Sequence, residues 1–229
     1  MAGLARQYRV ITHNLANANT TGFKRQISSM SQSTGGTSAS GGAGSITDRI
    51  SVDFGQGRLV HTGRALDFAL EGDNCFFVVE TPQGPLYTRN GVFRANAQGQ
   101  LVDAAGRMVG GKAGPIVIPP SVGVTGINVA RDGRISGGGQ TIGKLRIVEF
   151  EEPAQLTRAG GVAFRAPTRL APKPAANAVV YQGFQEGSNV VAVEELVDLI
   201  TLSRLYEANF KTIQTQDDRM KSIIQVAMG

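Results

Sequence analysis

The sequence is poor in the residues that build disulfides and metal sites. Among 229 residues there is one cysteine, there are two histidines, and there is no tryptophan. The single thiol of Cys75 cannot form an internal disulfide, and together with His13 and His61 it does not supply a zinc or iron–sulfur ligand set. The sequence therefore excludes a disulfide-stapled scaffold, and we expect no cofactor and no bound metal.

Long apolar runs are also missing. The longest, at residues 75–79, is far shorter than the ~20 residues that a membrane-spanning helix needs. The first residues lack the continuous apolar stretch of a secretory signal. We therefore expect no direct membrane insertion, and we expect any export from the cytosol to occur without a cleaved signal peptide.

The charge balance is basic, at +5, but the two ends of the chain differ in sign. Residues 1–27 carry four basic side chains and no acid, whereas residues 186–229 carry seven acids against four basic side chains. A nucleic-acid-binding surface on the basic N-terminus is one interpretation. The simpler interpretation is that the two ends attract each other, within one chain or between copies, and that no nucleic acid is bound.

The C-terminal segment has the clearest pattern. Residues 190–228 contain no glycine or proline, and apolar residues recur at alternating spacings of three and four. This pattern predicts one helix of about 38 residues, roughly 57 Å long. A domain of this size cannot cover such a helix, so its apolar seam needs partner helices. The seam positions that we expect at a polymerisation interface are Leu196, Leu199, Tyr206, Phe210, Ile213, Met220 and Ile224, with Ser203 and Asp217 as polar members.

The N-terminal segment predicts a shorter partner helix. Leu4, Tyr8, Ile11 and Leu15 recur at helical spacing and belong to the same expected interface. We expect the helix to end around residues 17–19, with Gly22 as the left-handed residue beyond it. Two interpretations stay open for Asn14 and Asn17. They are turn residues, or they are amides that fix the register between packed helices.

The middle of the chain predicts β structure. Residues 28–50 are rich in serine and glycine and indicate a flexible linker, whereas residues 51–187 alternate short β-prone runs with turns. The predicted fold class is mixed α and β. The N- and C-terminal helices form a coiled-coil-like helical domain, and a largely antiparallel β domain is inserted between them. The expected boundaries are 1–27 for the N-terminal helix and its motif, 28–50 for the linker, 51–187 for the β domain, and 188–229 for the long helix.

Three local patterns bear on function or topology. Asn90-Gly91 is the strongest hairpin signal in the chain. The stretch 138–144 matches part of a phosphate-binding loop, but a strand-like run follows it where a helix is required, so a glycine-rich hairpin is the better interpretation. His61 and Cys75 could form a base and a nucleophile if the fold joined them, and a hydrolase is therefore a rival hypothesis.

Several motifs together resemble the flagellar hook–basal body rod family. The N-terminal motif reads NLANANTTGFK at residues 14–24. The C-terminal motif reads SNVV at 188–191, VEELVDLI at 193–200 and YEAN at 206–209. The central motifs are LD at 66–67, GD at 72–73, FFVV at 76–79 and YTRNG at 87–91. They occur in order at both ends and in the centre, and the resemblance covers most of the chain.

The resemblance implies a structural protein and not an enzyme. It implies a subunit of the bacterial flagellar basal-body rod, which spans the periplasm as the drive shaft for motility. The implied partners are further copies, other axial proteins of the rod and hook, and the flagellar type III export apparatus. The chain length favours the proximal-rod type, and a distal-rod or hook subunit of the same family is the alternative.

Overall fold

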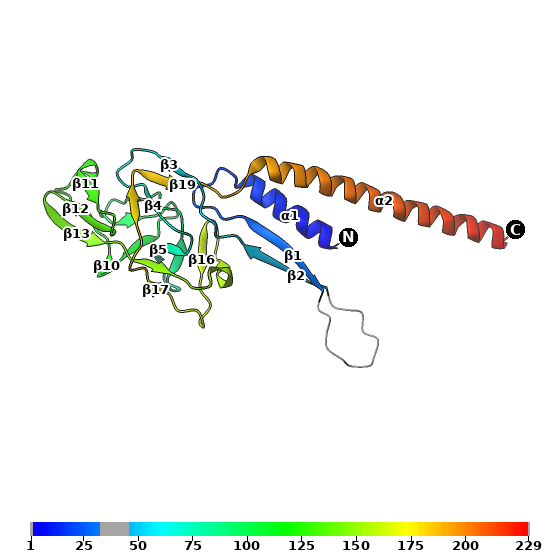
Figure 1. The fold of residues 1–229 in the computed structure, drawn as a ribbon, viewed down its shortest axis with the longest axis horizontal. Helices are drawn as coiled ribbons and strands as arrows, with labels where there is room; N and C mark the ends of the chain where they lie inside the picture. Colours follow the sequence, from blue (N-terminus) through cyan, green and yellow to red (C-terminus); the bar gives the residue numbers. More distant parts are fainter. Residues whose placement is uncertain (1, 33–45, 229) are drawn as a thin grey trace. The chain divides into compact units, whose positions relative to one another are not determined.

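The computed structural model describes residues 2–32 and 46–228, which divide into two compact units (Figure 1). The described parts of Met1–Ala16, Gln26–Ser51 and Val191–Gly229 form the first unit. Asn17–Arg25 and Val52–Val190 form the second. The chain therefore passes between the two units four times.

The first unit consists of two helices and a two-stranded sheet. Its elements are α1 (Ala2–Ala16), β1 (Gln26–Gln32), β2 (Ile46–Val52) and α2 (Ala192–Met228). With 37 residues, α2 confirms the predicted long helix. Glu194 and Glu195 lie in its first turn, where negative charge interacts favourably with the helix dipole. Figure 1 shows α1 beside the first part of α2, with α2 continuing past the N-terminus of α1.

Asn14 joins three elements of this unit. Its side chain is buried, with its Nδ2 donating to the backbone oxygen of Gln26 at 2.9 Å and to Glu195 Oε1 at 3.3 Å. Its Oδ1 accepts from the backbone nitrogen of Gln26 at 2.8 Å. Val10 and Ile11 are buried on the same helix. Asn14 thus fixes α1 against β1 and α2 at once, which is the register role considered for it.

The predicted linker differs from what the structure shows at its two ends. β1 and β2 pair with each other, so residues 28–32 and 46–50 belong to strands. Residues 33–45, also predicted as linker, lie outside the described residues. Sequence analysis missed β1 because its residues are mostly polar. In the structure, α1 supports this strand through the Asn14–Gln26 hydrogen bonds. The coiled-coil part of the fold prediction is not confirmed, since α1 packs on β1 as well as on α2.

The second unit is a β domain. Its strands are β3 (Leu59–His61), β4 (Phe68–Leu70), β5 (Cys75–Glu80), β6 (Leu86–Thr88), β7 (Arg94–Ala95), β8 (Leu101–Val102), β9 (Met108–Gly111), β10 (Gly114–Pro115), β11 (Ile127–Val129), β12 (Arg134–Gly137), β13 (Gln140–Lys144), β14 (Ile147–Glu149), β15 (Thr157–Arg158), β16 (Ala163–Arg165), β17 (Lys173–Pro174), β18 (Val180–Gln182) and β19 (Phe184–Glu186). Two short 3₁₀ helices are η1 (Val124–Gly126) and η2 (Pro153–Gln155). The main sheet has the order β15-β16-β6-β5-β9-β8-β7, with β10 beside β9, and β14 pairing with both β5 and β17. Smaller sheets are β11-β12-β13, β18-β4 and β19-β3.

Strand β5 lies at the centre of the domain. It pairs antiparallel with β6, β9 and β14. Phe76 and Val78 pack in one apolar cluster with Phe164, whereas Phe77 packs in another with Phe93. Successive side chains of a strand point to opposite faces, and both faces of β5 are covered. This explains why residues 75–79 form the longest apolar run in the sequence.

The prediction of a hairpin at Asn90-Gly91 is wrong. β6 ends before it and pairs with β5 and β16, and Val92 instead bridges to Asp67. Gly91 has no positive φ. A Cβ on it would lie 1.8 Å from the backbone oxygen of Phe68, so glycine is needed here for close packing and not for a turn.

The glycine-rich hairpin predicted at 138–144 is confirmed. β12 and β13 pair antiparallel, with Gly137 opposite Gln140. Gly138 and Gly139 form the turn between them, with φ values of 58° and 76°. Two positive φ values in a two-residue loop are the geometry of a tight hairpin, not of a loop that cradles phosphate before a helix.

Candidate assembly surface

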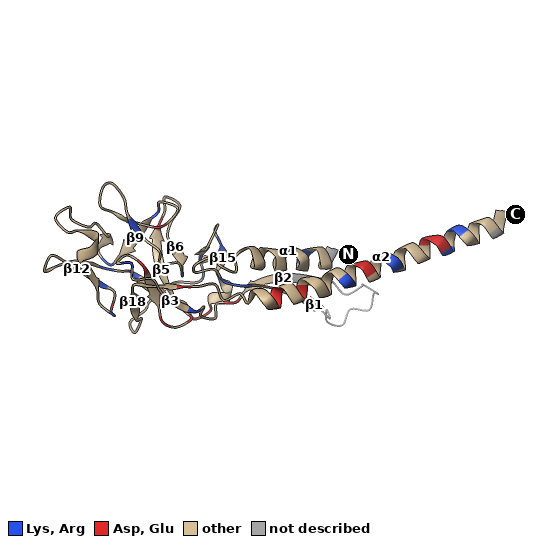
Figure 2. Ribbon diagram, turned by 90° about the horizontal axis from the view of Figure 1, so that it is seen from above, with Lys and Arg blue, Asp and Glu red and all other residues tan. Residues whose placement is uncertain are grey.

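The far part of α2 carries an uncovered apolar surface. In this distal segment, residues 208–228, every described side chain except the partly buried Asn209 is exposed. Its apolar side chains include Phe210, Ile213, Met220 and Ile224, here called the distal stripe, which are 50%, 42%, 61% and 52% exposed. Figure 2 shows that charged residues are interspersed along this helix. Several large apolar side chains exposed on one helix without tertiary support indicate an interaction site.

An apolar groove lies between α1 and the earlier part of α2. It has a volume of about 390 Å³ and is lined by Leu4, Ala5, Tyr8, Leu202, Ser203, Tyr206 and Glu207. Leu202 is almost fully buried there, whereas Tyr8 and Tyr206 are about half exposed. The two half-exposed rings leave apolar surface open at the groove, which a further helix could cover.

The structure divides the predicted interface residues into two groups. Ile11 and Asn14 are buried, and Leu4, Leu15, Asn17 and Leu199 are partly buried. The exposed group is Tyr8, Leu196, Tyr206, Phe210, Ile213, Met220 and Ile224. Asn17 contributes to a turn, because its backbone oxygen accepts from the nitrogen of Thr20 at 3.0 Å. The exposed group is available to another molecule, and its role in polymerisation stays a prediction.

Sequence analysis missed Leu202 and Glu195, which lie on the face of α2 that α1 covers. The expected seam started at Leu196 and followed a 3.5-residue repeat. An unsupercoiled α-helix has 3.6 residues per turn, so a 3.5-residue seam drifts by about 20° per heptad. A 3.6-residue period starting from Glu195 would have included both residues.

In the second unit, three residues that are far apart in the sequence form a buried charge cluster. Lys24, Arg89 and Glu186 all have fully buried side chains. Lys24 Nζ donates to Glu186 Oε1 at 2.6 Å, and Arg89 Nε donates to Glu186 Oε2 at 2.8 Å. Lys24 and Arg89 come from the N-terminal and central motifs, so this carboxylate joins residues of two family motifs.

Backbone groups complete the cluster. Lys24 Nζ also donates to the oxygen of Gly55 at 2.7 Å, and Arg89 Nη1 donates to the oxygen of Cys75 at 2.6 Å. The nitrogen of Gly57 donates to Glu186 Oε1 at 2.9 Å. Burial lowers the pKa of the Lys24 ammonium, with Glu186 opposing that shift. Buried charges that satisfy each other and nearby backbone groups specify one arrangement, and removing one partner is strongly destabilising.

The C-terminal motif enters the same region through Asn189. Its Oδ1 accepts from the backbone nitrogen of Arg25 at 2.7 Å, and its Nδ2 donates to the oxygen of Asp53 at 3.0 Å. On the N-terminal side, Gly22 has φ 69°, which confirms the left-handed conformation expected for it. Its nitrogen donates to the backbone oxygen of Glu186 at 2.7 Å. Residues of all three motifs therefore meet in this one region of the β domain.

The rival hydrolase hypothesis finds no support in the environments of its two residues. His61 stacks edge-on against Phe184, with ring centroids 4.9 Å apart. Burial raises the pKa of the Cys75 thiol, which is the opposite of what an activated nucleophile requires. Within residues 2–32 and 46–228, no cluster of histidine, cysteine and carboxylate side chains could hold a metal ion. None of the helices described combines the length and the apolar character of a membrane span.

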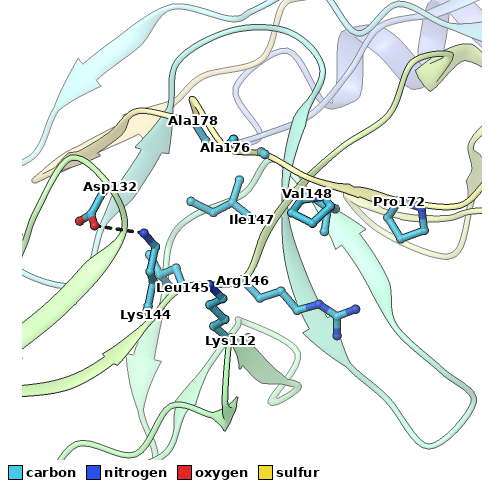
Figure 3. Close-up of a pocket in the computed structure, with 12 residues that line it drawn as sticks. Lys112, Asp132, Lys144, Leu145, Arg146, Ile147, Val148, Pro172, Ala176 and Ala178 are labelled. Carbon is cyan, nitrogen blue, oxygen red and sulfur yellow. Dashed lines mark hydrogen bonds and ion pairs between the residues drawn. The ribbon is translucent and has the colours of Figure 1, made fainter.

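The β domain also has a cavity with a basic rim (Figure 3). Lys112, Lys144 and Arg146 lie around it, with Ile147 and Val148 among its apolar lining residues. Lys144 pairs with Asp132 at 3.0 Å, an ion pair that Figure 3 shows at the edge of the cavity. Arg146 pairs with Glu80 at 3.2 Å.

The basic N-terminus is less available to nucleic acid than its composition indicates. Lys24, one of its four cationic residues, is fully buried and paired with Glu186. Phosphate binding requires cations that gather on an open face. The nucleic-acid interpretation therefore loses part of the charge on which it depended.

Comparison with known proteins matches the ends and the centre of the chain to three family models. These are "Flagella basal body rod protein" at residues 1–24, "Flagellar hook protein FlgE/F/G D1 domain" at 69–137, and "Flagellar basal body rod FlgEFG protein C-terminal" at 181–226. The three matched segments contain Lys24, Arg89 and Glu186 respectively.

Proteins that match nearly the whole chain carry names of the same family as these three models. A flagellar basal-body rod protein FlgF of Caulobacter vibrioides is 33% identical over 97% of this chain and 92% of its own length. A FlgG of Buchnera aphidicola (subsp. Acyrthosiphon pisum) is 34% identical over 95% of this chain, and a FlgG of Bacillus subtilis is 30% identical over 95%. For both FlgG proteins, the match covers 92% of the relative.

The fold and motifs define a mixed α and β protein in which a β domain is inserted, in sequence, between two terminal helices that pack against each other. With relatives that match over nearly their whole length, the chain belongs to the family of flagellar basal-body rod proteins.

Proposed function

We propose that this chain is a structural subunit of the flagellar basal-body rod that polymerises through its terminal helices into the axial drive shaft. Family membership and the names of the relatives support the rod assignment. The observation that carries the mechanism is the distal stripe of α2, which no described residue of the chain covers. Fully burying a large apolar side chain contributes about 1.5–3 kcal/mol, so covering these half-exposed side chains contributes roughly half of that each, and the gain is available only when neighbouring subunits are present.

The finer parts of the proposal rest on the chain length and on the family resemblance. The subunit is of the proximal-rod type, its neighbours are other rod and hook proteins, and it reaches the periplasm through the flagellar export apparatus without a cleaved signal peptide. A helix whose apolar face is covered only after assembly suits this route, because the chain can thread a narrow channel unfolded and form its contacts at the growing end. Torque then passes through interdigitated side chains that resist sliding.

The test places a charge in the distal stripe. Ile213→Asp should abolish incorporation into basal bodies, because a carboxylate would be buried at the subunit contact. Thr212→Asp is the matched control, since Thr212 is exposed and lies about 100° around the helix from Ile213. Incorporation is measured by microscopy of basal bodies purified from cells that carry a tagged copy. The thermal transition of the β domain should be the same in both variants. Normal incorporation of Ile213→Asp would contradict the proposed mechanism.

A further inference from the structure

The cavity with the basic rim in the β domain is held open by backbone hydrogen bonds. The backbone nitrogen of Lys112 donates to the oxygen of Lys144 at 2.8 Å, which fixes two cation-bearing segments to each other. The nitrogen of Ala175 donates to the oxygen of Ile147 at 3.2 Å and so fixes the segment that follows β17. The volume of the cavity, about 400 Å³, lies within the range of roughly 300–1,000 Å³ that is usual for ligand pockets. The cavity is therefore preformed.

The apolar lining of this cavity is part of the core of the domain. Leu145, Ile147 and Val148 line it, and all three side chains are buried in the two large apolar clusters. Because these side chains are already packed in the core, they cannot move to fill the cavity. Small side chains that leave room for a ligand also line it, namely those of Ala175, Ala176 and Ala178.

The rim of the cavity carries a surplus of positive charge. Lys112, Lys144 and Arg146 line it, and Asp132 is the one acidic residue among the lining residues. Lys144 pairs with Asp132, and Arg146 pairs with Glu80, but these ion pairs are open to water and contribute only about 0–1 kcal/mol each. Lys112 is exposed and has no ion-pair partner among the described residues. The three cations are therefore available to an incoming carboxylate.

The spacing of the cations favours an extended ligand. Lys144 and Arg146 flank Leu145, which forms an antiparallel bridge to Gly111. Residues two apart on an extended backbone lie roughly 7 Å from each other. Two acidic residues that flank a single residue on an extended peptide have the same separation. Such a peptide can place one carboxylate near each of these two cations.

The apolar lining gives the ligand a second side. Figure 3 shows the three cations on one side of Ile147, and Ala176 and Ala178 on the other. Successive side chains of an extended peptide point in opposite directions. When the two acidic side chains of a peptide point toward the cations, the residue between them therefore points toward the alanines. An apolar residue at this middle position is complementary to that side of the cavity.

We propose that this cavity binds an extended acidic segment of a partner protein, in which two carboxylate side chains flank one apolar residue. An inorganic anion would use the charge of the rim but would leave the apolar lining in contact with water, so a peptide segment is the better match. The lining residues all belong to the second unit. The inference is therefore independent of polymerisation through the terminal helices, and its failure would leave the proposed function standing.

Peptide binding tests the charge and the spacing. The probe is a fluorescein-labelled peptide that contains Glu-Val-Glu between glycines and has no charge at either end. Fluorescence anisotropy should show saturable binding to the full-length chain at a concentration at which sedimentation finds it monomeric, and binding should weaken as salt is added. Control peptides with Glu-Glu-Val or Glu-Gly-Glu should bind several-fold more weakly. Equal binding of the Glu-Glu-Val peptide would overturn the proposed spacing.

Variants of the chain locate the binding site. Lys112→Glu should weaken binding of the Glu-Val-Glu peptide about tenfold, because repulsion replaces attraction at the rim. Ala176→Phe should also weaken it, since the ring would fill the cavity without changing the charge. The matched control is Arg165→Glu, which makes the same charge change at an exposed residue of β16 outside the lining and should leave the affinity unchanged. Circular dichroism checks that all three variants fold.

Two outcomes would overturn the proposed site. Equal losses from Lys112→Glu and Arg165→Glu would show that the peptide responds only to the net charge of the chain. Displacement of the peptide by an equal concentration of inorganic phosphate would show that the cavity binds simple anions as well as it binds the peptide.

Discussion

Glu186 is the residue on which most of the motif contacts depend. One buried carboxylate accepts hydrogen bonds from a lysine, an arginine and a backbone amide. Two cations and one anion share a site closed to solvent, so neither cation has an alternative partner of opposite charge within the cluster. Such a site is more valuable for specifying one arrangement of segments than for adding stability.

Removing the Glu186 carboxylate should strongly lower the free energy of unfolding. Glu186→Ala leaves Lys24 and Arg89 buried without a counter-charge, and we expect a loss of about 3–5 kcal/mol in the free energy of unfolding. Urea denaturation followed by circular dichroism measures it. The control is Glu151→Gln, which breaks an exposed ion pair with Lys173 and should leave the midpoint unchanged. Equal effects of the two substitutions would refute the role given to the buried cluster.

Cys75 offers a test by chemical modification. Its pKa is raised by burial, so at a given pH near neutrality less thiolate is present than on an unfolded chain. We expect iodoacetamide to alkylate the native protein more slowly than the urea-unfolded protein at every pH from 7 to 9. Because the folded state holds this proton more tightly, the contribution of Cys75 to stability falls as pH rises through the thiol's range. Faster alkylation in the native state would revive the nucleophile hypothesis.

At the scale of elements, the sequence predicted the long helix, the antiparallel β domain and the hairpin at Gly138-Gly139. Each depends on a local pattern. It did not predict β1 or the packing at Gly91, because both depend on contacts with residues distant in the sequence. β1 is rich in serine, so its composition resembled that of a linker. The charge cluster was hidden for the same reason, although Lys24 and Arg89 lay within recognised motifs.

Gly91 and Gly126 differ in how closely the chain packs around them, and substitution by alanine tests that difference. Gly91→Ala should destabilise the β domain by several kcal/mol, since its Cβ would overlap the backbone oxygen of Phe68. Gly126→Ala should be neutral or slightly stabilising, because nothing lies within 4 Å of a Cβ there and its φ is not positive. Thermal unfolding compares the two variants. A neutral Gly91→Ala would show that the strand ends can shift apart.

At the scale of the whole molecule, the two parts of α2 should differ in stability before assembly. Residues 192–207 pack in part against α1, whereas the described side chains of residues 208–228 are exposed except for the partly buried Asn209. A helix without tertiary support is marginal in water. In dilute monomer we therefore expect rapid amide hydrogen exchange in the distal segment and slower exchange before it. In assembled material both parts should be protected. Full protection of the distal segment in a monomer would contradict assembly-coupled ordering.

The position of the charge cluster along the chain has a mechanical consequence. Lys24 follows the end of α1 by eight residues, and Glu186 precedes the start of α2 by six. A pull applied through either helix therefore reaches the β domain through residues 22–25 or 186–189, which are hydrogen-bonded to each other. If the chain serves in a rotating shaft as proposed, both helices would transmit load to the β domain through this one set of contacts.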